Sequence, residues 1–136
     1  MGLLKKLFGG ATEKKEEKVL PWIELNNVSQ LQDIEKKSKS KVQVIFKHST
    51  RCGVSRMVIN QFVASYNLTE EFIDLYYLDL LNYREVSDKI AEKFQVWHES
   101  PQLLVIKNAV VVAHASHGQI NAVDLKRFVD SSRVMG

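Results

Sequence analysis

Cys52 is the only cysteine of the chain, and it lies in the stretch FKHSTRCGVS with Ser55 three residues later. A dithiol redox protein would carry its second cysteine at the position of Ser55. A serine hydroxyl donates a hydrogen bond to a thiolate, but it does not attack a disulfide. One sulfur performs one half of a thiol-disulfide exchange. The sequence therefore predicts a covalent intermediate on Cys52 that the thiol of another molecule resolves.

A second feature lies in the stretch HESPQLLVI, where Pro101 stands at the entry to a strand and follows Ser100. Bonds before proline are nearly the only ones that adopt the cis form in folded proteins. A cis bond here would leave the N–H and C=O groups of Ser100 free to pair with an extended substrate. A Ser-Pro pair by itself is more often a trans turn, so the isomer stays open at this point.

Cys52 is expected between a buried strand and a helix. The run VQVIFK at 42–47 is almost entirely apolar and rich in β-branched residues, as is typical of a strand buried on both faces. From Val54, apolar residues recur at every fourth position as far as Tyr66, which predicts a helix. The sulfur would then lie at the N-terminus of this helix.

The first turn of a helix stabilises a thiolate because its N–H groups lack partners and the helix dipole is positive there. Gly53 and Val54 belong to this turn, and Arg51 and Arg56 add positive charge near the sulfur. A free cysteine has a pKa of about 8.5, whereas comparable helix-terminal cysteines reach roughly 3.5 to 7.5. We therefore expect much of Cys52 to be thiolate at neutral pH. The alternative is a small structural cysteine in the core.

Five other polar residues are weighed and left out of the catalytic set. Lys47 and His48 precede Cys52, but either side chain could face the site or the solvent. His98, His114 and His117 are too scattered to predict a metal site, because zinc sites show closely spaced ligand pairs with more sulfur.

The remaining elements are read from periodicity and turn residues. They are an edge strand in LPWIEL, a helix in NNVSQLQDIEKKS, a strand over 71–80, a helix opened by a capping box of Asn82 and Glu85, a hairpin of QLLVI and VVVAH, and a last helix over 121–129. Trp22 and Trp97 are expected to be packing residues. The order β-α-β-α-β-α-β-β-α predicts an α/β thioredoxin-like fold, with a mixed central sheet of about five strands and helices on both faces.

The length and the charge distribution of the chain predict one domain with a basic tail. The 136 residues carry a net charge of +3, and residues 1–18 supply +2 of it with five lysines against three glutamates. We expect a flexible tail over 1–18 and a single domain over 19–136. Because the remainder is almost neutral, a nucleic-acid partner is not expected. A lone cysteine fits a reducing cytosol, and no segment is apolar over the length of a membrane span, so we expect a cytoplasmic protein. We also expect a monomer without a bound cofactor, and a tail that does not contact a membrane.

With both segments identified, the chain resembles the monothiol bacilliredoxins, thioredoxin-like proteins of the bacterial bacillithiol system. The matching pieces are FKHSTRCGVS, YYLDLLNYREVSDKIAEKFQVWHESPQ and AHASHGQI, within residues 20–133. The resemblance implies that Cys52 removes bacillithiol, a glutathione substitute and the thiol co-substrate, from S-thiolated partner proteins. It also implies that Pro101 is a cis proline. Substrate docking is assigned to Thr50, Ser100, Pro101 and His117.

The chain departs from the family pattern at Gly53, where the family has proline. The resulting CGVS is similar to the CGFS of monothiol glutaredoxins, some of which hold a [2Fe-2S] cluster between two subunits. The glycine pair that follows the hairpin in glutaredoxins is absent here, and HASHG stands in its place. Bacilliredoxin is therefore the preferred interpretation. An iron-sulfur carrier and a non-enzymatic adaptor with a protein-binding groove are the alternatives.

Overall fold

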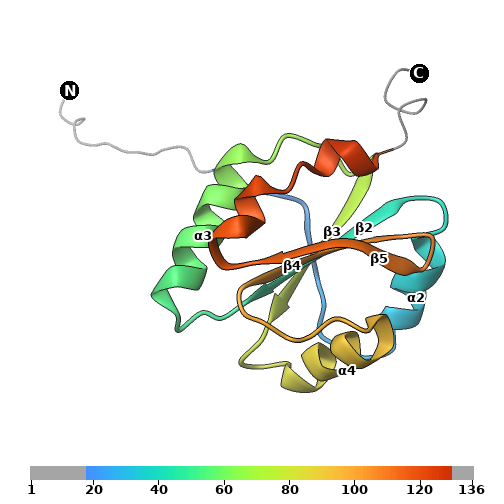
Figure 1. Cartoon of the computed structure of the whole chain (residues 1–136), viewed down its shortest axis with the longest axis horizontal. Helices are drawn as coiled ribbons and strands as arrows, with labels where there is room; N and C mark the ends of the chain where they lie inside the picture. The colour runs from blue at the N-terminus through green and yellow to red at the C-terminus, as the bar shows by residue number, and fades with distance from the viewer. Residues whose placement is uncertain (1–17, 130–136) are drawn as a thin grey trace, which may run out of the picture.

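The structure is a computed structural model that describes residues 18–129 (Figure 1). The strands in this range are β1 (Trp22–Glu24), β2 (Val42–His48), β3 (Ile73–Asp79), β4 (Gln102–Lys107) and β5 (Val110–Ser116). The helices are α2 (Gln30–Lys37), α3 (Gly53–Ser65) and α4 (Arg84–Phe94), followed by the 3₁₀ segments η1 (His117–Ala122) and η2 (Leu125–Phe128). Residues 1–17 of the predicted tail lie outside the described range.

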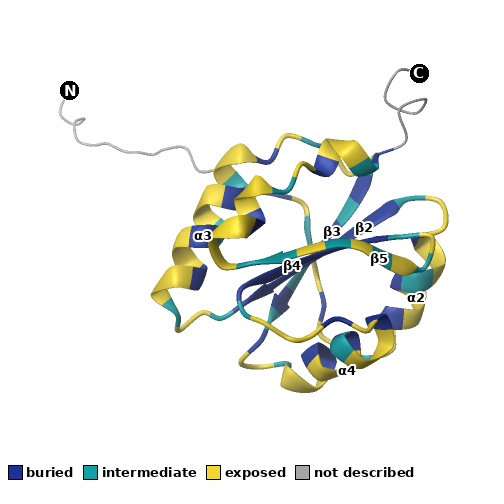
Figure 2. Cartoon of the chain, viewed as in Figure 1, coloured by how far each residue is buried: buried dark blue, intermediate teal, exposed yellow. Residues whose placement is uncertain are grey.

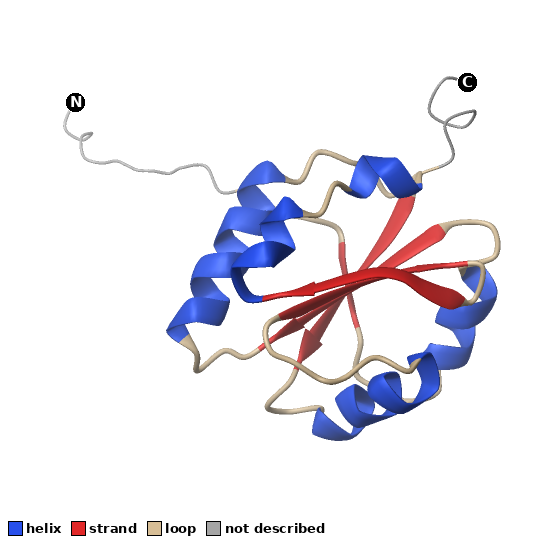
Figure 3. Cartoon of the chain, viewed as in Figure 1, coloured by secondary structure: helices blue, strands red, loops and turns tan. Residues whose placement is uncertain are grey.

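The strands form one mixed sheet in the order β1-β3-β2-β4-β5 (Figure 3). β1 and β2 both run parallel to β3, whereas β4 is antiparallel to β2 and to β5. The predicted mixed sheet of about five strands is confirmed, and so is the edge position of the first strand. The β4–β5 turn has positive φ at both Asn108 and Ala109, as a tight hairpin turn requires.

Helices cover both faces of the sheet, as predicted, and each face has its own core (Figures 1 and 2). All seven residues of β2 are buried, which explains its continuous apolar run. Phe46 packs with α3 and the 3₁₀ segments, whereas Ile45 packs with α2 and α4. Because side chains alternate along a strand, Lys47 faces the same side as Ile45 and His48 the same side as Phe46.

Two local predictions are wrong. The helix expected over 121–129 is replaced by η1 and η2, because the backbone is extended at Val123 and Asp124, and the Asp124 side chain accepts a hydrogen bond from the Lys126 N–H. The expected capping box is also absent. Tyr83 is the N-cap of α4, and the Asn82 amide instead donates to Asp79 at 2.7 Å.

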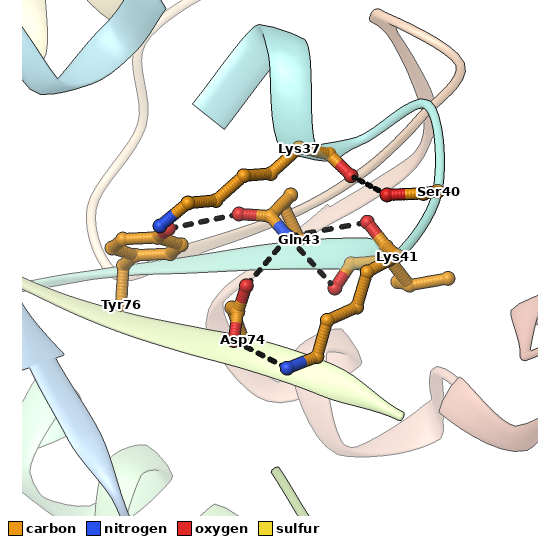
Figure 4. A network of polar contacts seen from close by, with 7 residues as sticks. Lys37, Ser40, Lys41, Gln43, Asp74 and Tyr76 are labelled. Atoms are coloured by element: carbon orange, nitrogen blue, oxygen red, sulfur yellow. Dashed lines mark hydrogen bonds and ion pairs between the residues drawn. The ribbon is translucent and has the colours of Figure 1, made fainter. Parts of the chain in front are cut away.

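A buried polar network lies at the end of β2 opposite His48 (Figure 4). The Gln43 side chain accepts a hydrogen bond from the Tyr76 hydroxyl at 2.8 Å and donates one to Asp74 at 2.9 Å. Lys41 forms an ion pair with the same carboxylate at 2.9 Å. These contacts join β2 to β3 across the sheet and satisfy polar groups that burial would otherwise leave unpaired.

None of the helices within residues 18–129 combines the length and the apolar composition that a membrane span requires.

Candidate active site

Cys52 is the N-cap residue of α3, as the sequence predicts. Its backbone is extended (φ −101°, ψ 122°), and its carbonyl accepts the first helical hydrogen bond from the Arg56 N–H at 3.0 Å. The thiol is free and half-buried. The chain reaches it from the end of β2 through the short segment Ser49–Arg51, where the Cys52 N–H donates to the Ser49 carbonyl at 3.2 Å. The sulfur therefore lies at the positive end of a helix and within reach of solvent.

The first turn of α3 contains no acidic residue, so no carboxylate there opposes a negative charge on the sulfur. Gly53 begins the helix, and a Cβ placed on it would meet no atom within 4 Å. Val54 is 47% exposed, which corrects its assignment to the apolar face of the helix. The buried apolar stripe begins one turn later at Val58, while Ser55 is the buried residue of the first turn.

Positive charge surrounds the start of α3. Arg51 is exposed beside Cys52, and the Arg56 guanidinium donates to the Thr50 carbonyl at 3.3 Å. This contact holds Arg56 close to the loop that carries the cysteine.

Ser55 is fully buried, and its hydroxyl has partners other than Cys52. Its Oγ lies 2.8 Å from Nδ1 of His48 and accepts a hydrogen bond from the Ser49 N–H at 3.1 Å. The expected hydrogen bond from Ser55 to the Cys52 sulfur is therefore not present in this structure. The sequence leaves the direction of His48 open, and the structure turns its side chain toward Ser55.

His48 is buried at the end of β2, next to Tyr77 and Asp79 of β3. Burial lowers the pKa of His48 below its ordinary value, Asp79 raises it in part, and Arg56 lowers it further. Burial thus disfavours the imidazolium form, and when the ring is neutral the tautomer determines whether Nδ1 accepts the hydrogen bond from Ser55 or donates it.

The predicted docking segment contains the cis peptide that the family resemblance implies, between Ser100 and Pro101. The Ser100 hydroxyl is buried and has no hydrogen-bond partner among the described residues. His117 lies beside this segment, since its N–H donates to the Pro101 carbonyl at 3.1 Å. Gln102 pairs with Lys47 near the C-terminal end of β2, so the docking segment lies at the same end of the sheet as the segment that leads to Cys52.

The direction of Lys47, which the sequence leaves open, is resolved by the structure: its side chain is fully buried on the α4 side of the sheet. Its ammonium group lies 3.4 Å from the Ser87 carbonyl and 3.3 Å from Nδ1 of His98. Burial lowers the pKa of Lys47 from its ordinary value of 10.5 to about 8, although Asp88 partly opposes this shift. A charged, hydrogen-bonded Lys47 thus anchors the chain just before the docking segment.

The same segment is held by Gln102, whose amide donates to the Trp97 carbonyl at 2.9 Å. Trp97 itself is 90% exposed, so its expected packing role is wrong, whereas Trp22 does pack against Phe46 and Phe62. A buried lysine before a histidine gives no local periodic signal. Only the tertiary structure reveals that Lys47 and Gln102 hold the docking segment, because their contacts join elements that are far apart in the sequence.

The described residues contain no group of three or more His, Cys, Asp or Glu side chains arranged to hold a metal ion. His98 is bonded to Ser87 and Lys47, and His114 is exposed on β5. Cys52 does not line the cavity of about 450 Å³ between α3 and the 3₁₀ segments or the cavity of about 300 Å³ beside Trp97.

Comparisons with known proteins agree with this geometry. A family model described as monothiol bacilliredoxin BrxC matches residues 23–125. One solved structure, described as an oxidoreductase with a thioredoxin fold, is 34% identical with a TM-score of 0.65, over 77% of this chain and 90% of that chain.

Two thioredoxins show the fold alone. The thioredoxin of Malassezia sympodialis is 14% identical with a TM-score of 0.59, over 90% of this chain and 96% of that one. The thioredoxin of Fasciola hepatica is 20% identical with a TM-score of 0.55, over 77% and 93% of the two chains.

Proposed function

The chain belongs to the family of monothiol bacilliredoxins, with a thioredoxin fold and a thiol redox function, and we propose that it removes bacillithiol from S-thiolated proteins through Cys52. The observation that carries the proposal is the position of this single, half-buried thiol at the N-terminus of α3. First-turn N–H groups and nearby arginines favour a thiolate there, and a thiolate is the form that attacks a disulfide.

The reaction has two exchange steps. In the first, the Cys52 thiolate attacks the bacillithiol sulfur of the mixed disulfide, that disulfide breaks, and the target protein leaves with a free thiol. In the second, another bacillithiol attacks the adduct on Cys52 and leaves as oxidised bacillithiol. Because Ser55 is not a cysteine, no internal thiol competes with this second step.

The target protein binds along the surface around the half-buried Cys52. The backbone of Ser100 and Pro101 pairs with an extended target segment, and Thr50 and His117 border it. Val54 and Met57 support this assignment, because both are about half exposed on the first turns of α3, at 47% and 54%. An exposed apolar rim suits contact with a protein better than contact with a small polar thiol alone.

Intact-mass spectrometry of the full-length protein tests the proposal. The protein is exposed separately to oxidised bacillithiol and oxidised glutathione between pH 5 and pH 9, with Cys52→Ala as the control. We expect one adduct on Cys52 that forms rapidly below pH 7, forms faster with bacillithiol, and is absent from the variant. An S-bacillithiolated protein should then release its bacillithiol only when wild-type protein and bacillithiol are both present.

Other outcomes would replace the proposal. Equal rates with glutathione would overturn the choice of bacillithiol. Reaction only near the pKa of an ordinary thiol would overturn the enzymatic role and favour an adaptor. A brown dimer after reconstitution with iron, sulfide and thiol would favour an iron-sulfur carrier.

A further inference from the structure

The Ser55 hydroxyl belongs to the first turn of α3, which Cys52 caps, and it contacts His48 of β2. A hydroxyl has one proton to donate and two lone pairs to accept with. The Ser49 N–H takes one lone pair at 3.1 Å, so the 2.8 Å contact with His48 uses either the hydroxyl proton or the second lone pair. If His48 accepts, the proton of Ser55 points to the imidazole. If Nδ1 of His48 carries a proton, the Ser55 proton is released for another acceptor.

No hydrogen bond joins Ser55 to Cys52 in this structure, and the acceptor that we infer for a released Ser55 proton is the Cys52 sulfur. Cys52 caps α3, and Ser55 follows it by three residues, a spacing at which side chains in the first turn can meet. A thiolate accepts hydrogen bonds strongly because it is charged. The proton of Ser55 therefore has two competing destinations, His48 and the sulfur.

Asp79 is the neighbour of His48 that favours a proton on the imidazole, against the larger effect of burial. Asp79 lies directly opposite His48 in the parallel β2–β3 pair, and one oxygen of its carboxylate is buried without a hydrogen-bond partner among the described residues. The ring of Tyr77 lies 5.8 Å from the imidazole, centroid to centroid. Arg56 of α3 is the positive charge that acts on it, while Lys47 faces the other side of the sheet.

We propose that His48 is a positioning residue that shares a proton with the reacting sulfur of Cys52 through the Ser55 hydroxyl. This inference rests on the proposed function and adds its proton path. When His48 is protonated, Nδ1–H donates to Ser55, and Ser55 donates to the thiolate. The thiolate and the imidazolium therefore stabilise each other.

One proton is transferred in each of the two exchange steps. As Cys52 attacks the mixed disulfide, the leaving thiolate of the target protein takes the bonding electron pair and receives the proton of His48 by way of Ser55. The adduct then has a neutral sulfur and a neutral imidazole. As the thiol of bacillithiol attacks the adduct, its proton returns along the same path to His48, oxidised bacillithiol leaves, and Cys52 is a thiolate again.

The rate at which iodoacetamide alkylates Cys52 of the full-length protein, measured from pH 4 to pH 9, tests the path. His48→Asn keeps an amide near the position of Nδ1 but carries no titratable proton. We expect alkylation at pH 6 to slow by roughly tenfold, as for the loss of one hydrogen bond to a charged group, with no change at pH 9. His114→Asn, on the exposed face of β5, is the matched control and should follow the wild type.

Nuclear magnetic resonance of the His48 ring nitrogens provides a measurement that needs no variant to fold. We expect the titration midpoint of His48 to fall when Cys52 is S-methylated, and this change to disappear in Ser55→Ala. A His48 titration that ignores S-methylation, or an unchanged alkylation profile in His48→Asn, would overturn the proton path.

The two proposals fail in different ways. A wild-type alkylation profile centred near the pKa of a free cysteine, about 8.5, would overturn the proposed function itself. A profile that is shifted below this value but is insensitive to His48 would leave the function standing and overturn the path.

Discussion

At the residue scale, Gly53 shows how little the family's proline would change in this chain. Proline suits the first helical position because its fixed φ is helical and the missing N–H has no partner there. It also requires an extended residue before it, and Cys52 already has that backbone, at φ −101° and ψ 122°. A Cβ at position 53 would meet no atom within 4 Å.

We therefore predict that Gly53→Pro raises the free energy of unfolding by about 0.5–1 kcal/mol, because it restricts the unfolded chain. Urea denaturation of both proteins measures the gain. A lower stability would mean that the backbone at position 53 is not compatible with proline. The alkylation rate of Cys52 measured in parallel reports how much the lost N–H contributes to the thiolate.

At the element scale, the pairing of β2 with β3 depends on Gln43 as well as on apolar contacts. Its amide joins the buried hydroxyl of Tyr76 to the carboxylate of Asp74. Removal of one partner leaves the other buried and unpaired, which costs more than the hydrogen bond itself contributes.

Gln43→Met should therefore lower the free energy of unfolding by about 1–3 kcal/mol. Tyr76→Phe in the same protein should return part of this loss, because no unpaired hydroxyl then remains. Denaturation of the two single variants and the double variant measures the coupling. Additive losses would contradict it. Alkylation of Cys52, at the other end of β2, should be the same in all four proteins.

At the scale of the whole molecule, the buried Lys47 makes stability depend on pH. Its pKa is about 8 in the folded protein against an ordinary 10.5, so the folded state holds its proton less tightly than the unfolded state does. Below pH 8 both states are charged, and the folded state carries the full cost of a buried ammonium group. Between pH 8 and pH 10.5 the unfolded state binds more protons, so stability rises with pH.

We predict that the free energy of unfolding increases by roughly 1–3 kcal/mol across this window. Chemical denaturation between pH 7.5 and pH 9.5 measures the increase, and Lys47→Met should remove it. An equal slope in the variant would assign the effect to other groups. Above about pH 10 the trend should reverse, because burial raises the pKa of both Tyr66 and Tyr76 to about 12 and their unfolded forms ionise first.

Acid should also destabilise the fold, because burial lowers the pKa of His48 and of His98. Just below their ordinary pKa the unfolded state binds more protons than the folded state.

The sequence by itself determined the order of the elements up to β5, the mixed sheet and the place of Cys52 at a strand-to-helix junction. Each of these follows from local periodicity, because burial on one face or two faces repeats every two or four residues. Local periodicity failed after β5, where Asp124 bonds to the nearby backbone and separates two 3₁₀ segments from what the pattern predicted as one helix.

Only the tertiary structure decided what surrounds Cys52. Ser55 is three residues from Cys52, yet its hydroxyl bonds to His48, and the direction of His48 depends on how β2 packs against α3 and β3. Lys47 likewise has its partners on α4 and in the segment before Pro101. These contacts join residues that are far apart in the chain, so no repeat in the sequence announces them. The same reason explains why the sequence located Cys52 at the start of α3 but not the contact between Ser55 and His48.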